Sequence, residues 1–313
     1  MKRILAVMIG MILVLATLGT AYALSYTYTT LDYPNASYNW LNGINNGGTI
    51  VGTYNISIVD PDHGYSLSNW TYTPVTYPGS SSTAANGINN GGTIVGYYSD
   101  SSGALRGYSL SNGIYTSLSD PFGSTVSGAT GINDGGTIVG WYYDNNGVSQ
   151  GYSLSNGVYT SLSYSGASGT WATGINNGNT IAGYYLDASG MYHSFSLSNG
   201  TYTPVTYPGS SQTLAGGINN GGTIAGYYYG DTGWGHSFSL TDGTYTPLDY
   251  PGASDGTYAV GINDGGTIVG FYRVDGSDNY HGFRANPVPI PGGILLFAPG
   301  LLGLAVLRRR FKN

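Results

Sequence analysis

One ten-residue phrase recurs six times along this chain. It first reads Gly-Ile-Asn-Asn-Gly-Gly-Thr-Ile-Val-Gly, and the copies begin at Gly43, Gly87, Gly131, Gly174, Gly217 and Gly261. Their spacings of 44, 44, 43, 43 and 44 residues are typical of a propeller blade or of one turn of a solenoid. We therefore expect six similar units, each burying its apolar side against its neighbours.

Each repeat divides into four short segments with the composition of β-strands. In the second repeat they are a segment ending at residue 89 and residues 93–98, 107–110 and 114–118. An Asn-Gly turn, the strongest short hairpin signal, joins the first two. Three successive hairpins make an antiparallel meander, which is the blade of a β-propeller.

The two ends of the repeat region complement each other. Residues 28–34 (Tyr-Thr-Thr-Leu-Asp-Tyr-Pro) match residues 245–251, which form the last strand of the fifth repeat, whereas the sixth repeat stops at Phe283 after three strands. An N-terminal strand would therefore complete the last blade and close the ring. The prediction is an all-β, six-bladed β-propeller of four-stranded antiparallel blades over residues 24–284; an open β-solenoid is the alternative.

The order of strands within a blade follows from proline and alanine. Pro74, Pro204 and Pro247 lie in the fourth segment, and proline is tolerated on edge strands because it has no N–H for a ladder. The fourth strand is therefore expected at the outer edge and the first at the axis. One slot of that first strand holds a small side chain in five of the six repeats, with Leu41 as the exception: Ala85, Ala129, Ala172, Ala215 and Ala259.

Composition excludes several functions. The chain has no Cys, its 15 acidic residues are all Asp, and residues 24–287 contain only three basic residues, a formal charge of 3 − 15 = −12. Such a body cannot neutralise phosphates, so no nucleic-acid partner is expected. Without Glu, Cys or a central Lys, catalysis is not expected either. Asp134 and Asp264 sit in the third and sixth repeats, on opposite sides of a ring, so they do not form a catalytic carboxylate pair.

The first 23 residues have the layout of a secretory signal peptide. Lys2 and Arg3 precede an apolar run over residues 4–18, and Ala21 and Ala23 form a small-residue cleavage pattern. Signal peptidase is thus an expected partner, with cleavage after Ala23. A permanent N-terminal anchor is the alternative.

Residues 285–313 have three parts: Val288, Pro289, Ile290 and Pro291; an apolar run over 294–307, expected to form a transmembrane helix; and Arg308, Arg309 and Arg310. This order resembles the PEP-CTERM sorting signal of Gram-negative bacteria, except that Ile290 stands where that family usually has Glu. The resemblance implies an exosortase-like processing enzyme, transient anchoring in the inner membrane, and delivery to the cell surface or extracellular matrix. A plain membrane anchor is the alternative.

The repeat unit also resembles the HAF-repeat family of extracellular bacterial proteins. The matching pieces are Pro-Gly-Ala at 251–253, Gly-Ile-Asn at 261–263 with Gly-Phe at 270–271, and His-Gly-Phe at 281–283. The resemblance spans roughly residues 26–283. It implies an extracellular repeat protein and brings no defined activity.

Few residues are candidates for chemistry or binding. One position of the repeat holds histidine in four repeats: His63, His193, His236 and His281. Equivalent positions of a ring are too far apart to bind one ion, so a structural role is expected for these side chains. Neither a metal nor another cofactor is expected. The loops between the second and third segments begin with Asp100, Asp144, Asp187 and Asp231 and have the composition of tight turns. The candidate ligand residues are Trp141, Trp234 and a ring at one channel mouth, formed by Asn45, Asn89, Asn133, Asn176, Asn219 and Asn263.

The leading interpretation is an exported, non-catalytic structural or interaction protein of the envelope or matrix. The alternative is a carbohydrate-binding propeller with extracellular polysaccharide as partner, in which Trp70 and Trp171 are further candidates. Trp packing between blades is the competing explanation for these side chains.

Overall fold

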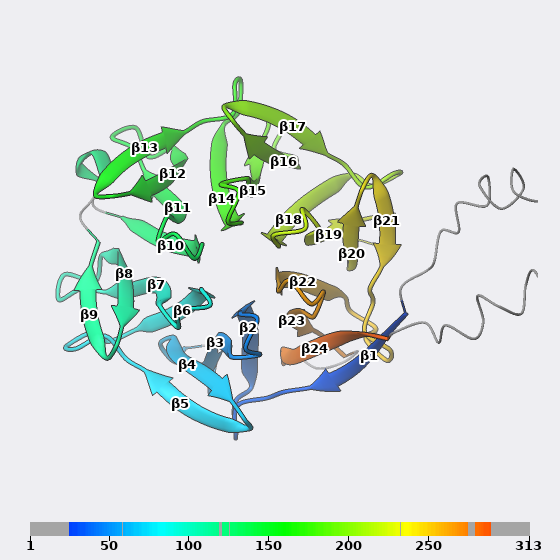
Figure 1. The fold of residues 1–313 in the computed structure, drawn as a ribbon, viewed down its shortest axis with the longest axis horizontal. Helices are drawn as coiled ribbons and strands as arrows, with labels where there is room; N and C mark the ends of the chain where they lie inside the picture. Colours follow the sequence, from blue (N-terminus) through cyan, green and yellow to red (C-terminus); the bar gives the residue numbers. More distant parts are fainter. Residues whose placement is uncertain are drawn as a thin grey trace, which may run out of the picture. The chain divides into compact units, whose positions relative to one another are not determined.

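The computed structural model describes residues 25–288, except 58, 119, 120, 125, 232 and 275–278. Six four-stranded antiparallel sheets surround a common axis (Figure 1). This arrangement confirms the six-bladed propeller and removes the open solenoid, because the last blade pairs with the first strand of the chain.

The blades follow one another along the chain. Blade 1 contains β2 (Tyr38–Ile44), β3 (Ile50–Asn55), β4 (His63–Ser68) and β5 (Thr71–Val75). Blade 2 contains β6 (Thr83–Ile88), β7 (Ile94–Ser99), β8 (Leu105–Ser111) and β9 (Ile114–Ser117). Blade 3 contains β10 (Ser127–Ile132), β11 (Ile138–Tyr143), β12 (Ser149–Ser155) and β13 (Val158–Leu162), preceded by the short 3₁₀ turn η1 (Pro121–Gly123).

The second half repeats this plan. Blade 4 contains β14 (Gly169–Ile175), β15 (Ile181–Leu186), β16 (Tyr192–Ser198) and β17 (Thr201–Val205). Blade 5 contains β18 (Gln212–Ile218), β19 (Ile224–Tyr229), β20 (Gly235–Thr241) and β21 (Thr244–Pro247). Blade 6 contains β22 (Thr257–Ile262), β23 (Ile268–Tyr272), β24 (His281–Val288) and, from the other end of the sequence, β1 (Ser25–Thr30).

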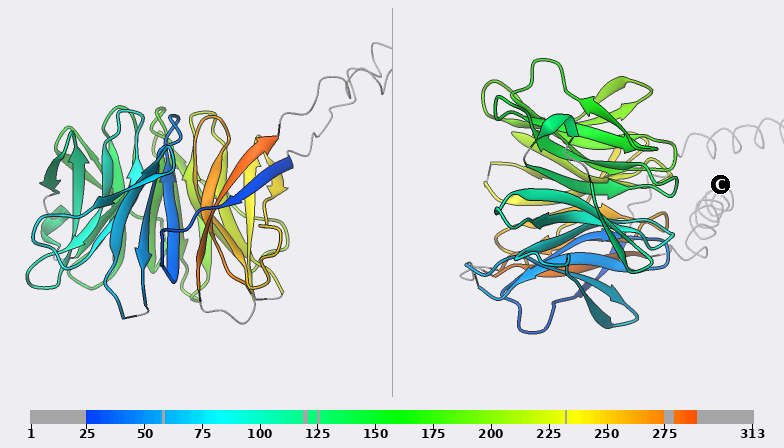
Figure 2. Two further views of the ribbon diagram at one scale, coloured as in Figure 1. Left: turned by 90° about the horizontal axis from the view of Figure 1, so that it is seen from below. Right: turned by 90° about the vertical axis from the view of Figure 1, so that its left-hand side faces the viewer.

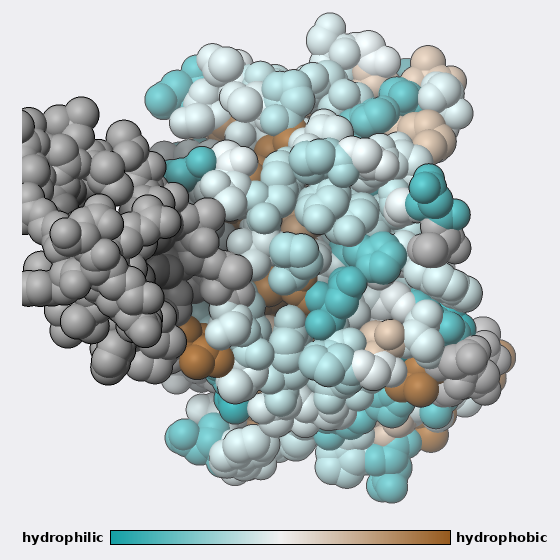
Figure 3. Space-filling model, turned by 90° about the vertical axis from the view of Figure 1, so that its right-hand side faces the viewer, coloured by the Kyte–Doolittle hydropathy of each residue, from teal (hydrophilic) through white to brown (hydrophobic). Residues whose placement is uncertain are grey.

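The strand order within each blade agrees with the proline argument. The first strand of each repeat lies at the axis and the fourth at the rim, with Pro74, Pro204 and Pro247 in the rim strands (Figure 1). The rim strands expose their Thr and Ser side chains and half-bury their Tyr side chains. The side shown in Figure 3 is mostly hydrophilic, with separate apolar spots.

Glycine sets how closely the blades approach at the axis. A Cβ on Gly87 would lie 2.8 Å from the carbonyl oxygen of Thr130 and 3.0 Å from the Cα of Gly131. Only glycine fits there, which explains why the repeated phrase begins with it. The repeated alanines are buried, as expected of a small slot, but they lie between blades: Ala85 packs with Val51 and Val75 of the preceding blade.

The N-terminal strand closes the ring. β1 pairs with β24, and Figure 2 shows them side by side in blue and orange. Just beyond β1, the Leu31 amide donates to the Gly282 carbonyl at 2.9 Å, and the Asp32 carboxylate accepts the Gly282 amide at 2.9 Å. Asp249 accepts the equivalent Ser237 amide in blade 5, so the clasp reproduces an ordinary blade contact.

Several sequence predictions lie outside the described residues. They are the signal peptide with Ala21 and Ala23, the motif residues Pro289, Ile290 and Pro291, the transmembrane helix, and Arg308, Arg309 and Arg310. Val288 is the last residue of β24. Within the part of the chain that the structure describes, no helix has the length and apolar character needed to cross a membrane.

Candidate functional site

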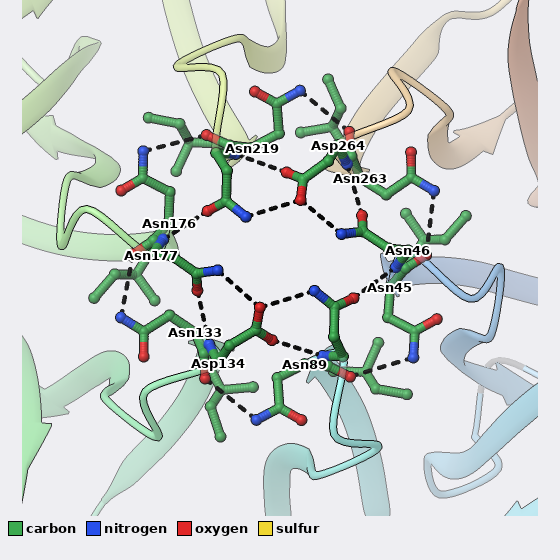
Figure 4. Close-up of a pocket in the computed structure, with 18 residues that line it drawn as sticks. Asn45, Asn46, Asn89, Asn133, Asp134, Asn176, Asn177, Asn219, Asn263 and Asp264 are labelled. Carbon is green, nitrogen blue, oxygen red and sulfur yellow. Dashed lines mark hydrogen bonds between the residues drawn. The ribbon is translucent and has the colours of Figure 1, made fainter.

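Two rings of side chains surround one mouth of the central channel (Figure 4). The first ring consists of the six predicted asparagines, which lie farther from the channel axis. Each donates from Nδ2 to the main-chain carbonyl of its counterpart in the next blade, at 3.1–3.2 Å, and the last one, Asn263, donates to Asn45. Each Oδ1 accepts an amide four residues later, for example from Thr49 at 3.0 Å. The expected turn role is therefore present, and a blade-to-blade link is added.

The residues that follow the asparagines form a second ring, which lies closer to the channel axis (Figure 4). Its members are Asn46, Asn90, Asp134, Asn177, Asn220 and Asp264. The main-chain amide of each donates to the side-chain Oδ1 of the next, at 2.7–2.9 Å, around the whole circle. Sequence reasoning noted only the two aspartates of this ring. The signal it missed was the order Asn, Asn, Asp, which occurs twice around the six repeats.

The two aspartates lie across the ring from each other and take up the free amide donors (Figure 4). Asp134 Oδ2 accepts Nδ2 of Asn90 at 2.8 Å and of Asn177 at 2.7 Å. Asp264 Oδ2 is bonded in the same way to Asn220 and Asn46. These groups are paired with one another around a hollow of about 70 Å³, so the ring links the six blades.

The same bonds set the ionisation of the two carboxyl groups. Desolvation raises the pKa of Asp134, but hydrogen bonds from Asn177 and Asn90 outweigh it and hold the pKa below the ordinary value of an aspartate. Hydrogen bonds from Asn46 and Asn220 likewise lower the pKa of Asp264 against desolvation. A lowered folded-state pKa means that this stabilisation is present above about pH 4 and is lost as the pH falls through the folded-state pKa.

The variant Asp134→Asn is expected to lose about 1 kcal/mol of unfolding free energy at pH 7. Asp134 accepts the Asn90 main-chain amide at Oδ1 and the Nδ2 groups of Asn90 and Asn177 at Oδ2. An Asn side chain has a single acceptor oxygen, so at least one of these donors loses its partner. The site is solvent-exposed, which keeps the loss small. Below pH 4 the difference from the wild type should shrink. Urea unfolding at pH 7 and pH 3 measures this, with Asp242→Asn in a β20–β21 turn as control. An unchanged difference at both pH values would contradict the role given to the carboxylate.

The opposite end of the channel carries an aromatic band. The band residues are Tyr38, Trp40, Trp171, Tyr184, Tyr192, Tyr227, Tyr229, Tyr258, Phe271 and Tyr280, all partly exposed. They occupy the starts of the inner strands, the ends of the second strands and the adjoining third strands or loops, away from the asparagine turns. They therefore form one surface across blades 4, 5, 6 and 1.

Ring contacts run along this band. Trp171 stacks on Tyr184 with centroids 5.2 Å apart, and Tyr227 meets Tyr258 edge-on at 5.1 Å across a blade boundary. Phe271 then contacts Tyr280, and the ring centroid of Tyr280 lies 5.6 Å from that of Trp40 in blade 1. Burial is the main reason that the pKa of Tyr229 is raised to about 12, so this hydroxyl stays protonated at neutral pH and can donate a hydrogen bond.

The four tryptophans that the sequence suggests as ligand contacts lie in different environments. Trp171 belongs to the band. Trp141 instead covers Gly128, where a Cβ would lie 3.0 Å from the indole, so it packs on its own blade. Trp234 is 42% exposed in the β19–β20 loop and remains a candidate contact residue. Trp70 is 71% exposed and lies in a β4–β5 turn, on the side of the asparagine turns.

The histidines have the structural role expected of them. Each pairs with an aspartate, as in the contacts of His193 with Asp187 at 2.9 Å and of His281 with Asp32 at 2.8 Å. Asp187 also accepts the Ser189 and Met191 amides, which fits a tight turn. Among the described residues, no cluster of three or more His, Asp, Glu or Cys side chains could hold a metal ion.

Comparison with known proteins adds the fold class alone. No protein-family model matches the chain, and no curated protein matches it in sequence. Among solved structures, AofleA from Arthrobotrys oligospora aligns with TM-score 0.55 and 14% identity, over 85% of this chain and 88% of that one. TolB from Acinetobacter baumannii aligns with TM-score 0.53 and 12% identity, over 81% and 65%. Trypanosoma rangeli sialidase aligns with TM-score 0.50 and 10% identity, over 90% and 57%.

Proposed function

We propose that this propeller is an exported, non-catalytic interaction protein that binds extracellular polysaccharide through its aromatic band. The carrying observation is the continuity of the band: partly exposed rings from four blades form one surface on a rigid scaffold. Aromatic faces stack on the C–H faces of sugar rings, and protonated Tyr hydroxyls at the edges can bond sugar hydroxyls. The body's charge of −12 gives no attraction to acidic polymers on this face, which favours a neutral glycan.

Several contacts along one surface suit a polymer better than a single small ligand. Each stacked sugar contributes a modest affinity, and linked sugars bind with a high effective concentration. The aromatic side chains of the band are also held rigidly. Because strand pairs and blade contacts hold the band, little side-chain freedom is lost when a glycan binds.

Export is the second part of the proposal. The signal-peptide pattern at residues 1–23, the sorting-like tail at 285–313 and the resemblance to extracellular HAF-repeat proteins support it. The protein would be anchored briefly in the inner membrane and then released to the cell surface or matrix. Intact mass of the protein from its host tests this: a species beginning near Leu24 and lacking the residues after Val288 is expected. A species that keeps Arg308 would contradict tail removal.

The binding surface is tested with Trp171→Ala on a glycan array. The wild type is expected to bind a set of neutral polysaccharides, and the variant to lose at least about tenfold in affinity, because a stacked Trp is a typical hot spot. The matched control is Trp70→Gly, which removes an exposed Trp from the other face and should leave neutral-glycan binding unchanged. Equal loss in both variants, or none in either, would sink the assignment to the band.

A further inference from the structure

A second cavity lies where blade 6 meets blade 1, on the side of the asparagine turns. Its volume is about 190 Å³, and its lining includes Trp70, Arg284, Gly47 and Gly48. The guanidinium carbon of Arg284 lies 5.7 Å from the centre of a Trp70 ring. The Nε atom of Arg284 is buried and has no hydrogen-bond partner among the described residues.

Both side chains depart from the repeat at their positions. The second residue of the turn between third and fourth strands is glycine in the four other described turns: Gly113, Gly157, Gly200 and Gly243. In blade 1 it is Trp70. The second residue of each second strand is Val or Ala, and it pairs across the sheet with a residue of the third strand. That third-strand residue is serine in the five other blades: Ser66, Ser109, Ser153, Ser196 and Ser239. In blade 6 it is Arg284, paired with Val269.

Trp70 holds an unfavourable backbone conformation. Its φ is +64°, in the left-handed region, where the four equivalent glycines have φ of +77° to +79°. A bulky residue in that region is strained, whereas glycine is not. Trp70 is also 71% exposed, so burial offsets little of the strain. Residues kept in strained conformations cluster at functional sites.

The geometry points to a binding site for a sugar ring that carries a carboxylate, a hexuronic acid unit. The exposed indole of Trp70 offers a flat apolar face for the ring. The planar guanidinium of Arg284, without an acidic partner in the described part of a body with 15 aspartates, matches a carboxylate. The cavity holds one sugar unit rather than a chain, and it lies on the opposite side of the ring from the aromatic band, so it extends the proposed function.

The test is a calorimetric titration of the full-length protein with methyl glucuronide, methyl glucoside and inorganic phosphate. The wild type should bind the glucuronide at least tenfold more tightly than either comparison compound. Trp70→Gly and Arg284→Ser, which restore the residues of the other blades, should each lose glucuronide binding. Arg273→Ser removes the same charge elsewhere and should bind like the wild type.

Thermal unfolding separates binding from a structural role. Trp70→Gly should raise the Tm by about 2–4 °C, because it relieves strain. A lowered Tm would mean that Trp70 and Arg284 support the blade junction, and would overturn the proposal. Equal binding of glucoside, or of phosphate alone, would also overturn it. None of these results bears on neutral-glycan binding at the aromatic band, which Trp171→Ala tests separately.

Discussion

Deletion of residues 25–33 is expected to cost the propeller more than about 5 kcal/mol of unfolding free energy, enough to unfold most domains of this size. The deletion removes the ladder partner of β24 and buried Leu31, together with the Asp32 bonds to Gly282 and His281. It also exposes the blade 6 core around Phe283 and Leu248. Guanidinium chloride unfolding followed by Tyr and Trp fluorescence would measure the loss.

A circularly permuted chain provides the control for this deletion. Placing residues 25–33 after residue 288 restores the ladder and the Leu31 contact while cutting the covalent link to blade 1. This variant should fold and recover most of the lost free energy, with a lower midpoint than the wild type. If the deletion unfolds at the same denaturant concentration as the wild type, β1 is not the closure device.

The second large effect is expected from Gly140→Ala in β11. A Cβ at this position would overlap the Gly128 carbonyl oxygen and lie 2.8 Å from the ring of buried Tyr152. Neither atom group can move far, because Gly128 is paired in β10 and Tyr152 is 1% exposed. Overpacking of this kind should cost at least about 3 kcal/mol.

Gly135→Ala in the same blade is the matched control. Its Cβ would meet only the Asn133 side-chain oxygen, at 3.4 Å, which is an ordinary contact. The change should alter the unfolding free energy by less than about 0.5 kcal/mol. Urea unfolding of both variants gives the comparison, and similar losses in the two would contradict the close-packing account of the repeated glycines.

Much of the fold could be predicted because the repeat itself carries the information. The period predicts the blades, the prolines predict the outer strand, and the match of 28–34 with 245–251 predicts the clasp. Alanine was a weaker guide. The repeated alanine position is small and buried, as expected. The inner strands of neighbouring blades nevertheless approach most closely at glycines such as Gly87, because strand twist and the bulge in the inner strand place these glycines at the axis.

The candidate sites were harder to predict, for two physical reasons. The first asparagine ring, made of Asn45 and its five counterparts, could be placed because one residue type recurs, but its blade-to-blade bonds depend on the turn geometry. The aromatic band arises from different slots in different blades: Trp40 faces Thr53, whereas Trp171 faces Tyr184. Large and small residues exchange places between paired strands, so no single repeat position predicts the band.

Hydrogen–deuterium exchange with and without a neutral polysaccharide selected on the glycan array tests the central claim most directly. The account predicts slower exchange in peptides that carry the aromatic band, around residues 38–40, 171–192 and 227–229, with the asparagine turns unchanged. Protection confined to the asparagine turns, or none anywhere despite saturation with the glycan, would contradict it.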